Sequence, residues 1–364
     1  MKNFEIFFRK FLLRLLLLLR KNSNENAAPL VSKESRILFV RLNRIGDALV
    51  TTPLLREVKE KLGCRIFVLA GSQNYFVFEN QKIADEIIVY RKNVHGIRSL
   101  IKLINELHFD VIVDLHDDVS STVSYLIAFS NCRYKFGLKK KNFKIFTHTV
   151  DKPDPTRNHV IERILEFRKL FNININSDKA NIVFEPKSDS IQAASDFVNN
   201  HFPSKKFLVG INISAGSEAR FWGISKFRQL IAELSSYDVE ILLLCSEKDL
   251  HNANQIAVNG VPIYYRPSFD EFCAIIPFLD FLVTPDTSII HVASAYYIPL
   301  FGLFVQYNTR EMIWSPFRSE FGCVITHEQT LKNISNESVN NKLIPLFEKV
   351  LNKKEKHDAK NPGM

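Results

Sequence analysis

Nine short apolar runs are the feature that most constrains how this chain can fold. In the first half they are RILFVR (36–41), RIFVLA (65–70), EIIVY (86–90) and VIVDL (111–115). In the second half they are FLVGINI (207–213), VEILLLC (239–245), FLVT (281–284), PLFGLF (299–304) and CVIT (323–326). The runs are nearly continuous in apolar residues, which indicates strands buried on both faces, and helix-like stretches separate them. The pattern predicts an α/β fold with doubly wound parallel sheets.

The strand pattern occurs twice, and the polar, proline-containing stretch NIVFEPKSDS (181–190) separates the two sets. A single hydrophobic core stops growing at about 250 to 300 residues, whereas this chain has 364. We therefore predict two Rossmann-like domains, at 36–185 and 186–351, that face a central cleft. Residues 22–35 are predicted to be a linker and residues 352–364 a disordered tail.

The net charge of +9 is concentrated in two segments. Residues 2–21 contain six basic side chains and one acid, and residues 133–144 contain six basic side chains and no acid. A nucleic-acid binder would also be basic, but this charge is segregated and no nucleic-acid-binding motif accompanies it. The five cysteines are far apart and form no C-x-x-C pair, which is typical of reduced thiols in a cytoplasmic protein and predicts no metal site.

Residues 1–21, MKNFEIFFRKFLLRLLLLLRK, combine apolar and basic side chains. The longest uninterrupted apolar run has five residues, far below the roughly 20 of a membrane-spanning helix, and Arg14 interrupts the block that a signal peptide would need. On a helix the large apolar side chains share one uncharged arc, which predicts a helix lying on an anionic membrane; the arc contains Phe4, Phe7, Phe8, Phe11, Leu12, Leu15, Leu18 and Leu19. A signal peptide, or a helix packed on the protein body or on a partner, remains an alternative.

Residues at strand exits are the candidates for a ligand site, because ligands of open parallel sheets bind beyond the carboxyl ends of the strands. LNRIGDAL follows the first strand, where Gly46 would give the backbone freedom for a tight turn. Asp47 then stands at the start of a helix, where an aspartate often serves only as an N-cap. The segment lacks G-x-G-x-x-G, which argues against a dinucleotide-dependent oxidoreductase.

The loop NISAGSEAR after the strand at 207–213 is suited to a phosphorylated ligand. Ser214, Gly216 and Ser217 would let backbone amides approach an anion, and the guanidinium of Arg220 can pair with phosphate oxygens. After the next strand, Glu247 could accept hydrogen bonds from a ribose or a base, or it could be a solvated loop acid.

The stretch PDTSIIHVAS (285–294) follows the strand at 281–284 and opens a helix. Asp286 stands at or near the N-cap, and Thr287 and Ser288 would offer hydroxyls and free amides to a diphosphate. His291 lies one turn further on, on the same side of the helix. The alternative is an ordinary capped helix with a buried histidine.

Five segments together resemble glycosyltransferase family 9, the ADP-heptose:lipopolysaccharide heptosyltransferases. They are ILFVRLNRIGDALVTTPLLREVKEK, VDLH, RYKFGL, NISAGSEARFWGISKF and TPDTSIIHVASAYYIPLFGLF, between about residue 36 and residue 318. The resemblance implies a GT-B architecture, with the acceptor bound by the first domain and the ADP-sugar by the second. It also implies an inverting transfer that needs no metal or other cofactor.

The same resemblance assigns roles to individual residues. It places the catalytic aspartate on Asp47, the phosphate-binding lysine on Arg220, the acidic nucleotide contact on Glu247, and the D-T-G-x-x-H motif on Asp286, Thr287, Ser288 and His291. Arginine thus replaces lysine, serine replaces glycine, and LFVQYNTREMIW lacks the usual turn after its strand. Residues expected to meet the acceptor are Gly46, Arg133, Lys135, Lys139, Lys140 and Lys141. For Lys139 to Lys141, a plain solvated loop is an equal alternative.

The expected partners follow from this function. They are a nucleotide sugar, expected to be the ADP-heptose of the family, the lipopolysaccharide core, and the cytoplasmic face of the inner membrane. The protein is expected to be a cytoplasmic monomer that does not bind nucleic acid. A transferase with another nucleotide sugar, or a non-catalytic binder of sugar nucleotides, would carry the same motifs.

Overall fold

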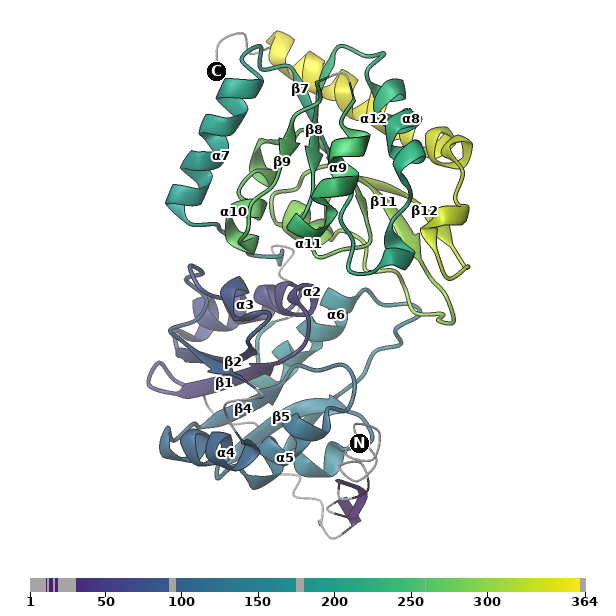
Figure 1. Cartoon of the computed structure of the whole chain (residues 1–364). Helices are drawn as coiled ribbons and strands as arrows, with labels where there is room; N and C mark the ends of the chain where they lie inside the picture. Colours follow the sequence, from purple (N-terminus) through teal and green to yellow (C-terminus); the bar gives the residue numbers. More distant parts are fainter. Residues whose placement is uncertain are drawn as a thin grey trace. The chain divides into compact units, whose positions relative to one another are not determined.

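The computed structural model describes residues 11, 13–15, 17–18, 31–91, 96–174, 180–258 and 260–360. The chain divides into two compact units, Met1–Phe184 and Glu185–Met364. Each unit is built on one six-stranded sheet in which every strand pairing is parallel (Figure 1). This confirms the predicted class of doubly wound parallel sheets.

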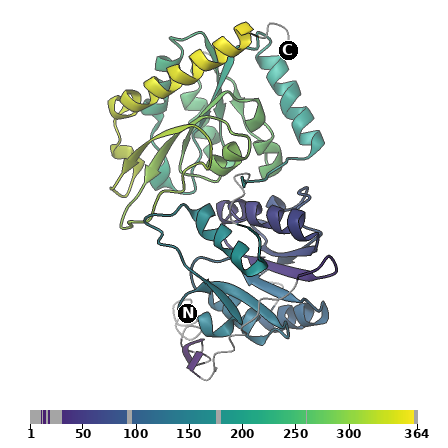
Figure 2. The ribbon, with the colours of Figure 1, turned by 180° about the vertical axis from the view of Figure 1, so that it is seen from behind.

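The sheet of the first unit has the strand order β3-β2-β1-β4-β5-β6. Helices α3 and α6 cover one face of it and α4 and α5 the other (Figures 1 and 2). The strands are β1 (Arg36–Arg41), β2 (Arg65–Gly71), β3 (Glu86–Tyr90), β4 (Val111–Asp114), β5 (Tyr134–Lys139) and β6 (His148–Asp151). The helices are α2 (Ile45–Leu49), α3 (Thr52–Leu62), α4 (Ile97–Glu106), α5 (Ser121–Phe129) and α6 (Val160–Leu165), with 3-10 turns η1 (Tyr75–Val77), η2 (Phe143–Ile145) and η3 (Glu166–Phe171).

The sheet of the second unit has the order β12-β11-β10-β7-β8-β9. Its strands are β7 (Phe207–Asn212), β8 (Val239–Leu244), β9 (Ile263–Tyr264), β10 (Phe281–Pro285), β11 (Leu300–Val305) and β12 (Phe321–Thr326). Its helices are α7 (Ser188–His201), α8 (Ile224–Leu234), α9 (Leu250–Ile256), α10 (Phe269–Cys273), α11 (Ile289–Ala295) and α12 (Asn336–Lys360). Four 3-10 turns complete it: η4 (Glu218–Arg220), η5 (Glu247–Asp249), η6 (Ile276–Phe278) and η7 (Leu331–Asn333).

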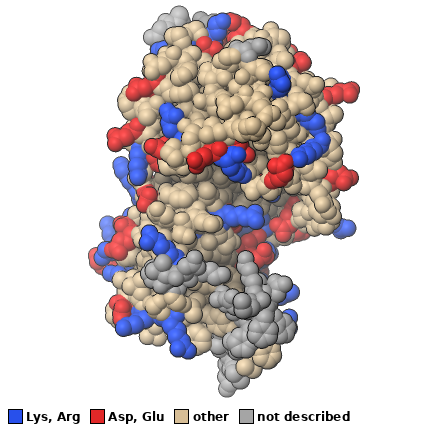
Figure 3. Space-filling model, in the orientation of Figure 1, with Lys and Arg blue, Asp and Glu red and all other residues tan. Residues whose placement is uncertain are grey.

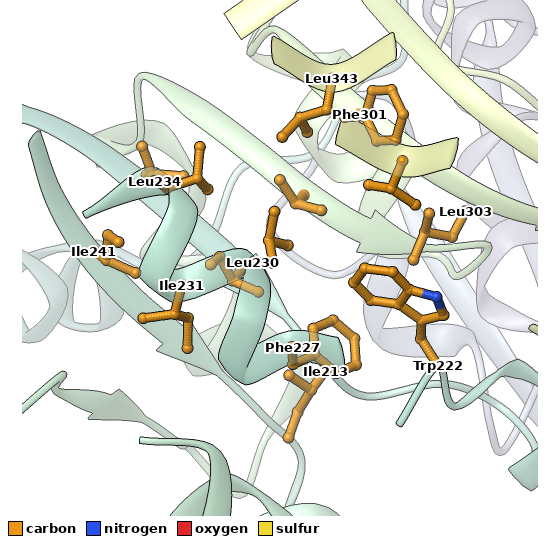
Figure 4. Close-up of a cluster of buried hydrophobic side chains, with 14 of the residues drawn as sticks. Ile213, Trp222, Phe227, Leu230, Ile231, Leu234, Ile241, Phe301, Leu303 and Leu343 are labelled. Atoms are coloured by element: carbon orange, nitrogen blue, oxygen red, sulfur yellow. The ribbon is translucent and has the colours of Figure 1, made fainter. Parts of the chain in front are cut away.

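The core of the second unit fixes the loop that follows β7. Trp222 is buried, its indole N–H donates to the carbonyl of Ile334 at 2.9 Å, and its ring meets that of Phe227 edge-on at 5.3 Å (Figure 4). A fully buried aromatic side chain contributes about 1.5–3 kcal/mol through burial. Since Arg220 lies two residues before Trp222, this packing anchors one end of the loop that carries it.

Three strands were not predicted: β5, β6 and β9. Strand β5 runs through the basic stretch 133–144, and its sequence YKFGLK has buried residues from Lys135 to Leu138. The lysines interrupt the apolar signal there, and β9 is only two residues long.

The segment from residue 352, predicted to be disordered, instead continues α12 as far as Lys360, so that prediction is wrong for the residues described. Lys354 ties the helix to the body of the second unit. Its ammonium lies 2.5 Å from Asp280 and 5.5 Å from the centre of the Phe207 ring.

Six residues of the amino-terminal segment are described, and all of them are helical. Leu13 is buried and Leu17 packs against the cluster beneath α4 and α5, whereas Phe11, Leu15 and Leu18 are exposed. The described residues thus combine a contact with the protein body and an exposed apolar arc; the rest of the predicted arc lies outside the described residues. Among the described helices, none has the length and apolar character to cross a membrane.

Candidate active site

Each sheet has one point where the direction of strand winding reverses. In the first unit it lies between β1 and β4, and in the second between β7 and β10. Ligands of open α/β sheets bind at such a switch point, beyond the carboxyl ends of the strands. The residues after β1 include Asp47, and those after β10 include Asp286, so the two predicted motifs occupy the two switch points.

Asp47 lies inside α2 rather than at its cap. The N-cap position of α2 belongs to Arg44, which makes no capping hydrogen bond through its side chain. The reading of Asp47 as an N-cap is therefore wrong. Gly46 also belongs to α2, so the tight turn expected there is a helical turn.

The Asp47 carboxylate is held by Arg41, the last residue of β1. Oδ1 of Asp47 lies 2.8 Å from the NH2 group of Arg41, and Nε of Arg41 donates to the backbone carbonyl of Asp47 at 3.0 Å. The Arg41 side chain is 1% exposed and that of Asp47 16%. Burial lowers the pKa of Arg41, and the neighbouring carboxylates of Asp47 and Asp114 oppose that shift.

A second buried group of charges lies at the exits of β4 and β5. Nδ1 of His116 lies 2.7 Å from Oδ1 of Asp114, and the ammonium of Lys140 lies 2.9 Å from the other oxygen of Asp114. Nε2 of His116 accepts the backbone N–H of Leu42 at 3.1 Å. With one ring nitrogen accepting and the other bonded to a carboxylate, His116 is a neutral imidazole that donates through Nδ1.

The pKa shifts agree with this arrangement. Burial lowers the pKa of His116 below its ordinary value, although the hydrogen bond to Asp114 opposes the shift. Burial would raise the pKa of Asp114, but the ammonium of Lys140 and the hydrogen bond from His116 hold it well below its usual range. Asp114 is therefore ionised and His116 neutral at pH 7.

Acidification is expected to destabilise the first unit through His116. Because its folded-state pKa lies below 6.5, the unfolded chain binds more protons than the folded chain as the pH falls below 6.5. This contribution to the free energy of unfolding is fully present above pH 6.5 and is lost as the pH falls through the folded-state pKa. Each unit of pKa separation corresponds to about 1.4 kcal/mol. Denaturant titrations at a series of pH values measure the slope.

The variant His116→Gln should flatten this pH dependence, whatever it does to stability at pH 8. The matched control is His108→Asn, at an exposed position with φ 49° that asparagine tolerates. The control should keep the wild-type slope. An unchanged slope in His116→Gln would show that other groups cause the acid sensitivity.

In the second unit, hydrogen bonds join the exits of β7, β8 and β10. The amide of Asn212 donates to the hydroxyl of Thr284 at 2.9 Å and to the carbonyl of Ser214 at 3.2 Å. The hydroxyl of Ser214 donates to Oδ2 of Asp249 at 2.6 Å and accepts the backbone N–H of Ser246 at 2.7 Å. Ser214 therefore connects two loops through its side chain, and a role in binding phosphate stays a prediction.

Arg220 and the start of the D-T-S motif lie together. The NH2 group of Arg220 is 3.1 Å from Oδ2 of Asp286, and the NH1 group of Arg220 donates to the Asp286 carbonyl at 3.2 Å. The hydroxyl oxygen of Thr287 is buried and has no hydrogen-bond partner within the described parts of the chain. Both Arg220 and Asp286 are partly exposed, so the guanidinium remains accessible to an anion.

Ser288 occupies the N-cap of α11 with φ −59° and ψ −20°. These are right-handed helical angles, which serine adopts without strain, so the replacement of glycine by serine costs nothing in the backbone. Asp286, expected at or near this cap, lies two residues earlier. His291 is buried beneath the motif, with its ring centre 6.1 Å from that of Trp314. That matches the alternative of a buried histidine.

The remaining predicted donor residues, Gly216, Ser217 and Glu247, are exposed at loop ends. A Cβ on Gly216 would meet no atom within 4 Å, so its backbone is open to a ligand. Within the described part of the chain, no cluster of three or more histidine, cysteine, aspartate or glutamate residues could hold a metal ion.

The predicted acceptor residues separate into two groups. Arg133, Lys139 and Lys141 are exposed. Lys135 is buried and its ammonium donates to the carbonyl of Ser130 at 2.8 Å, so it does not belong to a basic surface. Lys140 is bound to Asp114 as described above. On the face drawn in Figure 3, basic and acidic side chains are interspersed.

Sequence reasoning missed one cavity. It has a volume of about 340 Å³ at the carboxyl ends of β11 and β12, where the unusual VQYNTREM segment runs; it is lined by Gln306, Asn308, Thr309, Arg310 and His327. The buried cluster of Arg41, Asp114 and His116 was also not predicted. The sequence does contain a signal for it, because charged residues stand there at the ends of otherwise apolar strands. Such residues are almost never fully buried unless they are paired.

Solved structures of similar fold include bacterial glycosyltransferases. A glycosyltransferase family 9 protein of Veillonella parvula matches with a TM-score of 0.76 and 18% identity, over 90% of this chain and all of its own. The ADP-heptose lipopolysaccharide heptosyltransferase II of Escherichia coli matches with 0.68 and 17%, over 88% and 99%. The E. coli heptosyltransferase WaaC with ADP matches with 0.67 and 15%, over 87% and 99%. These likenesses show a GT-B fold.

Sequence comparison adds the family. An E. coli K12 protein with the provisional name lipopolysaccharide heptosyltransferase 4 is 23% identical over 350 residues, which are 93% of this chain and 92% of the relative. The model of glycosyltransferase family 9 (heptosyltransferase) matches residues 97–344, a range that begins after Asp47. Because this match spans more than half of the chain, the protein belongs to glycosyltransferase family 9 and is a glycosyltransferase of the heptosyltransferase type.

Proposed function

We propose that this protein transfers a heptose from ADP-heptose to the core of lipopolysaccharide or lipooligosaccharide, with inversion at the anomeric carbon and without a metal ion. The E. coli relatives named above support the choice of donor and acceptor. The observation that carries the proposal is chemical. An oriented carboxylate lies at the switch point of one sheet, and an arginine with hydroxyl groups lies at that of the other.

In the proposed reaction Asp47 is the general base. Its carboxylate takes the proton of an acceptor hydroxyl while that oxygen forms a bond to the anomeric carbon. The bond between the anomeric carbon and the phosphate oxygen breaks on the opposite face, and the electron pair leaves with ADP. One displacement of this kind inverts the configuration.

The second unit would stabilise the leaving group. Negative charge grows on the diphosphate in the transition state, where the guanidinium of Arg220, the hydroxyls of Thr287 and Ser288 and nearby backbone amides can interact with it. A preformed set of donors acts without reorganising during the reaction. These groups would supply the positive charge that a metal ion supplies in other transferases.

Product analysis tests this function directly. The purified protein is incubated with ADP-heptose, ADP-hexoses and UDP-hexoses, each with heptose-free core lipid, and the lipid is then weighed by mass spectrometry. The expected result is a gain of one heptose from ADP-heptose alone, undiminished by EDTA. Transfer from another nucleotide sugar would retain the reaction type and change the donor; no transfer from any donor would reject the proposal.

The acceptor would be met at the cytoplasmic face of the inner membrane by a monomer whose amino-terminal helix lies on the lipid. Phe11, Leu15 and Leu18 are exposed apolar side chains at i, i+4 and i+7, and the exposed Arg14 is basic. An apolar arc beside basic side chains suits an anionic membrane surface.

Replacing Phe11, Leu15 and Leu18 together by serine is expected to release the protein from anionic vesicles. Each side chain contributes about 1.5 kcal/mol or more when it enters an apolar phase, so partitioning should fall by about 1,000-fold or more. Flotation with phosphatidylglycerol-containing vesicles measures it. The buried Leu13 is left intact, so the melting temperature should hardly change.

The matched control replaces three exposed apolar residues of the second unit, Met312, Phe321 and Ile325, by serine. This control should float with vesicles like the wild type. If the amino-terminal variant also floats like the wild type, the exposed arc does not bind the membrane.

A further inference from the structure

We propose that Arg41 is a positioning residue for the catalytic carboxylate: it fixes the orientation of Asp47 so that Oδ2 receives the acceptor proton. The inference rests on the proposed role of Asp47 as general base. It assigns to Arg41 an effect on the rate that acts through Asp47 alone. Arg41 itself does not touch the substrate in this scheme, because its side chain is almost fully buried.

The contact between Arg41 and Asp47 fixes the orientation of the carboxylate as well as its distance from the guanidinium. Arg41 uses Nε for the backbone carbonyl of Asp47, at 3.0 Å, and NH2 for the side-chain Oδ1, at 2.8 Å. Two donors of one planar group thus bind two acceptors of one residue, which fixes both the position of the main chain and the rotation of the carboxylate. Oδ2 is left outside this contact, and the side chain as a whole is 16% exposed, so the carboxylate is partly open to a substrate.

Arg41 is itself held from two sides. Its NH1 group donates to the carbonyl of Leu115, directly after β4. The backbone carbonyl of Arg41 accepts a hydrogen bond from the buried side-chain amide of Asn74 at 3.1 Å. The guanidinium therefore connects Asp47 to the exit of β4, while the contact with Asn74 holds the main chain of Arg41.

A lysine at position 41 would keep the charge and lose the geometry. An ammonium is a point charge on a flexible stem, whereas the guanidinium is a rigid fork that can bind a carbonyl, a carboxylate and a second carbonyl at once. Arg41→Lys should therefore leave Asp47 next to a positive charge and near its place, with its orientation no longer fixed. Misplacement of a reacting group by about 1 Å can cost about 100-fold in rate.

The experiment compares kcat and the KM values of both substrates in Arg41→Lys and in the wild type. The expected result is a fall in kcat of about 30- to 100-fold, with an unchanged KM for the nucleotide sugar, whose proposed binding residues belong to the other unit. Thermal unfolding by circular dichroism checks that the variant is folded. A folded Arg41→Lys with the wild-type kcat overturns the proposal.

A double-mutant cycle with Asp47→Ala separates positioning from a general structural effect. If Arg41 acts through Asp47, adding Arg41→Lys to Asp47→Ala lowers kcat no further. If the second substitution lowers kcat by the same factor in both backgrounds, Arg41 acts through the fold and the proposal fails. If Asp47→Ala alone transfers heptose at the normal rate, the proposed base itself is wrong, which is a separate result.

Asp47→Glu provides a test that leaves Arg41 intact. The longer side chain keeps the carboxylate but moves it by one methylene relative to the guanidinium. A fall in kcat of about 10-fold or more supports a requirement for the fixed position. A normal kcat shows that the carboxylate need not be held there and overturns the proposal, even where Arg41→Lys fails to fold.

Discussion

Asp47→Ala is expected to lower kcat about 1,000-fold and to leave the dissociation constant of the nucleotide sugar unchanged. A general base contributes about 10²- to 10⁴-fold to a rate, and Asp47 is the only carboxylate among residues 42–51, which follow β1. Removing the carboxylate also takes away a partner of the buried Arg41 guanidinium, so thermal unfolding must show that the variant is folded. Initial rates of heptose transfer measure kcat, and calorimetry with ADP-heptose measures donor binding.

The matched control for this prediction is Asp151→Ala, which removes an exposed aspartate of the same unit at the end of β6. Its only described charge contact is with Lys139 at 3.4 Å, and exposed pairs of this kind contribute about 0–1 kcal/mol. The control should transfer heptose at the wild-type rate. A normal kcat in Asp47→Ala would mean that another group, or water, accepts the proton.

Arg220→Met is expected to lower kcat by about 100-fold and to weaken donor binding by about 10-fold. The larger effect falls on kcat because the charge of the diphosphate increases as it leaves. Arg220→Lys should recover part of the rate, since it keeps the charge and loses the fork. Steady-state kinetics with ADP-heptose, together with calorimetry, separate the two effects.

The fold of the second unit should survive this substitution. The pair of Arg220 with Asp286 is partly exposed on both sides, and such pairs contribute at most about 1 kcal/mol. Arg228→Met, on the exposed side of α8, is the matched control and should change neither kcat nor donor binding. If Arg220→Met changes neither, the diphosphate is bound elsewhere.

Strands buried on both faces could be predicted from the sequence, because short continuous apolar runs such as FLVGINI are typical of the strands of a parallel sheet. The boundaries observed for β1 and β3 are the predicted ones. Strands β6 and β9 lie at the edges of their sheets and could not be predicted, because an edge strand needs less apolar surface. Strand β5 could not be predicted because lysines interrupt its apolar pattern, and one of them, Lys135, is buried with its ammonium bonded to a carbonyl.

The site residues divide in a similar way. Asp47, Arg220 and the D-T-S motif could be named in advance because each follows a predicted strand or lies in the loop after one. The residues that lie against them or against each other at these strand ends could not be named from the sequence. Lys140 reaches Asp114 across 26 residues of sequence, and Arg41 reaches the carbonyl of Leu115 across 74. No local pattern contains either contact.

The sequence by itself determined which residues stand where strands end, because periodicity is a local property of the chain. Only the tertiary structure decided which of them meet. The order of the strands sets β1 beside β4 and β7 beside β10, so that Arg41 reaches Asp47 and Leu115, and Asn212 reaches Thr284. Burial then determines which charged side chains pair, since a charge removed from water is stable only next to a partner.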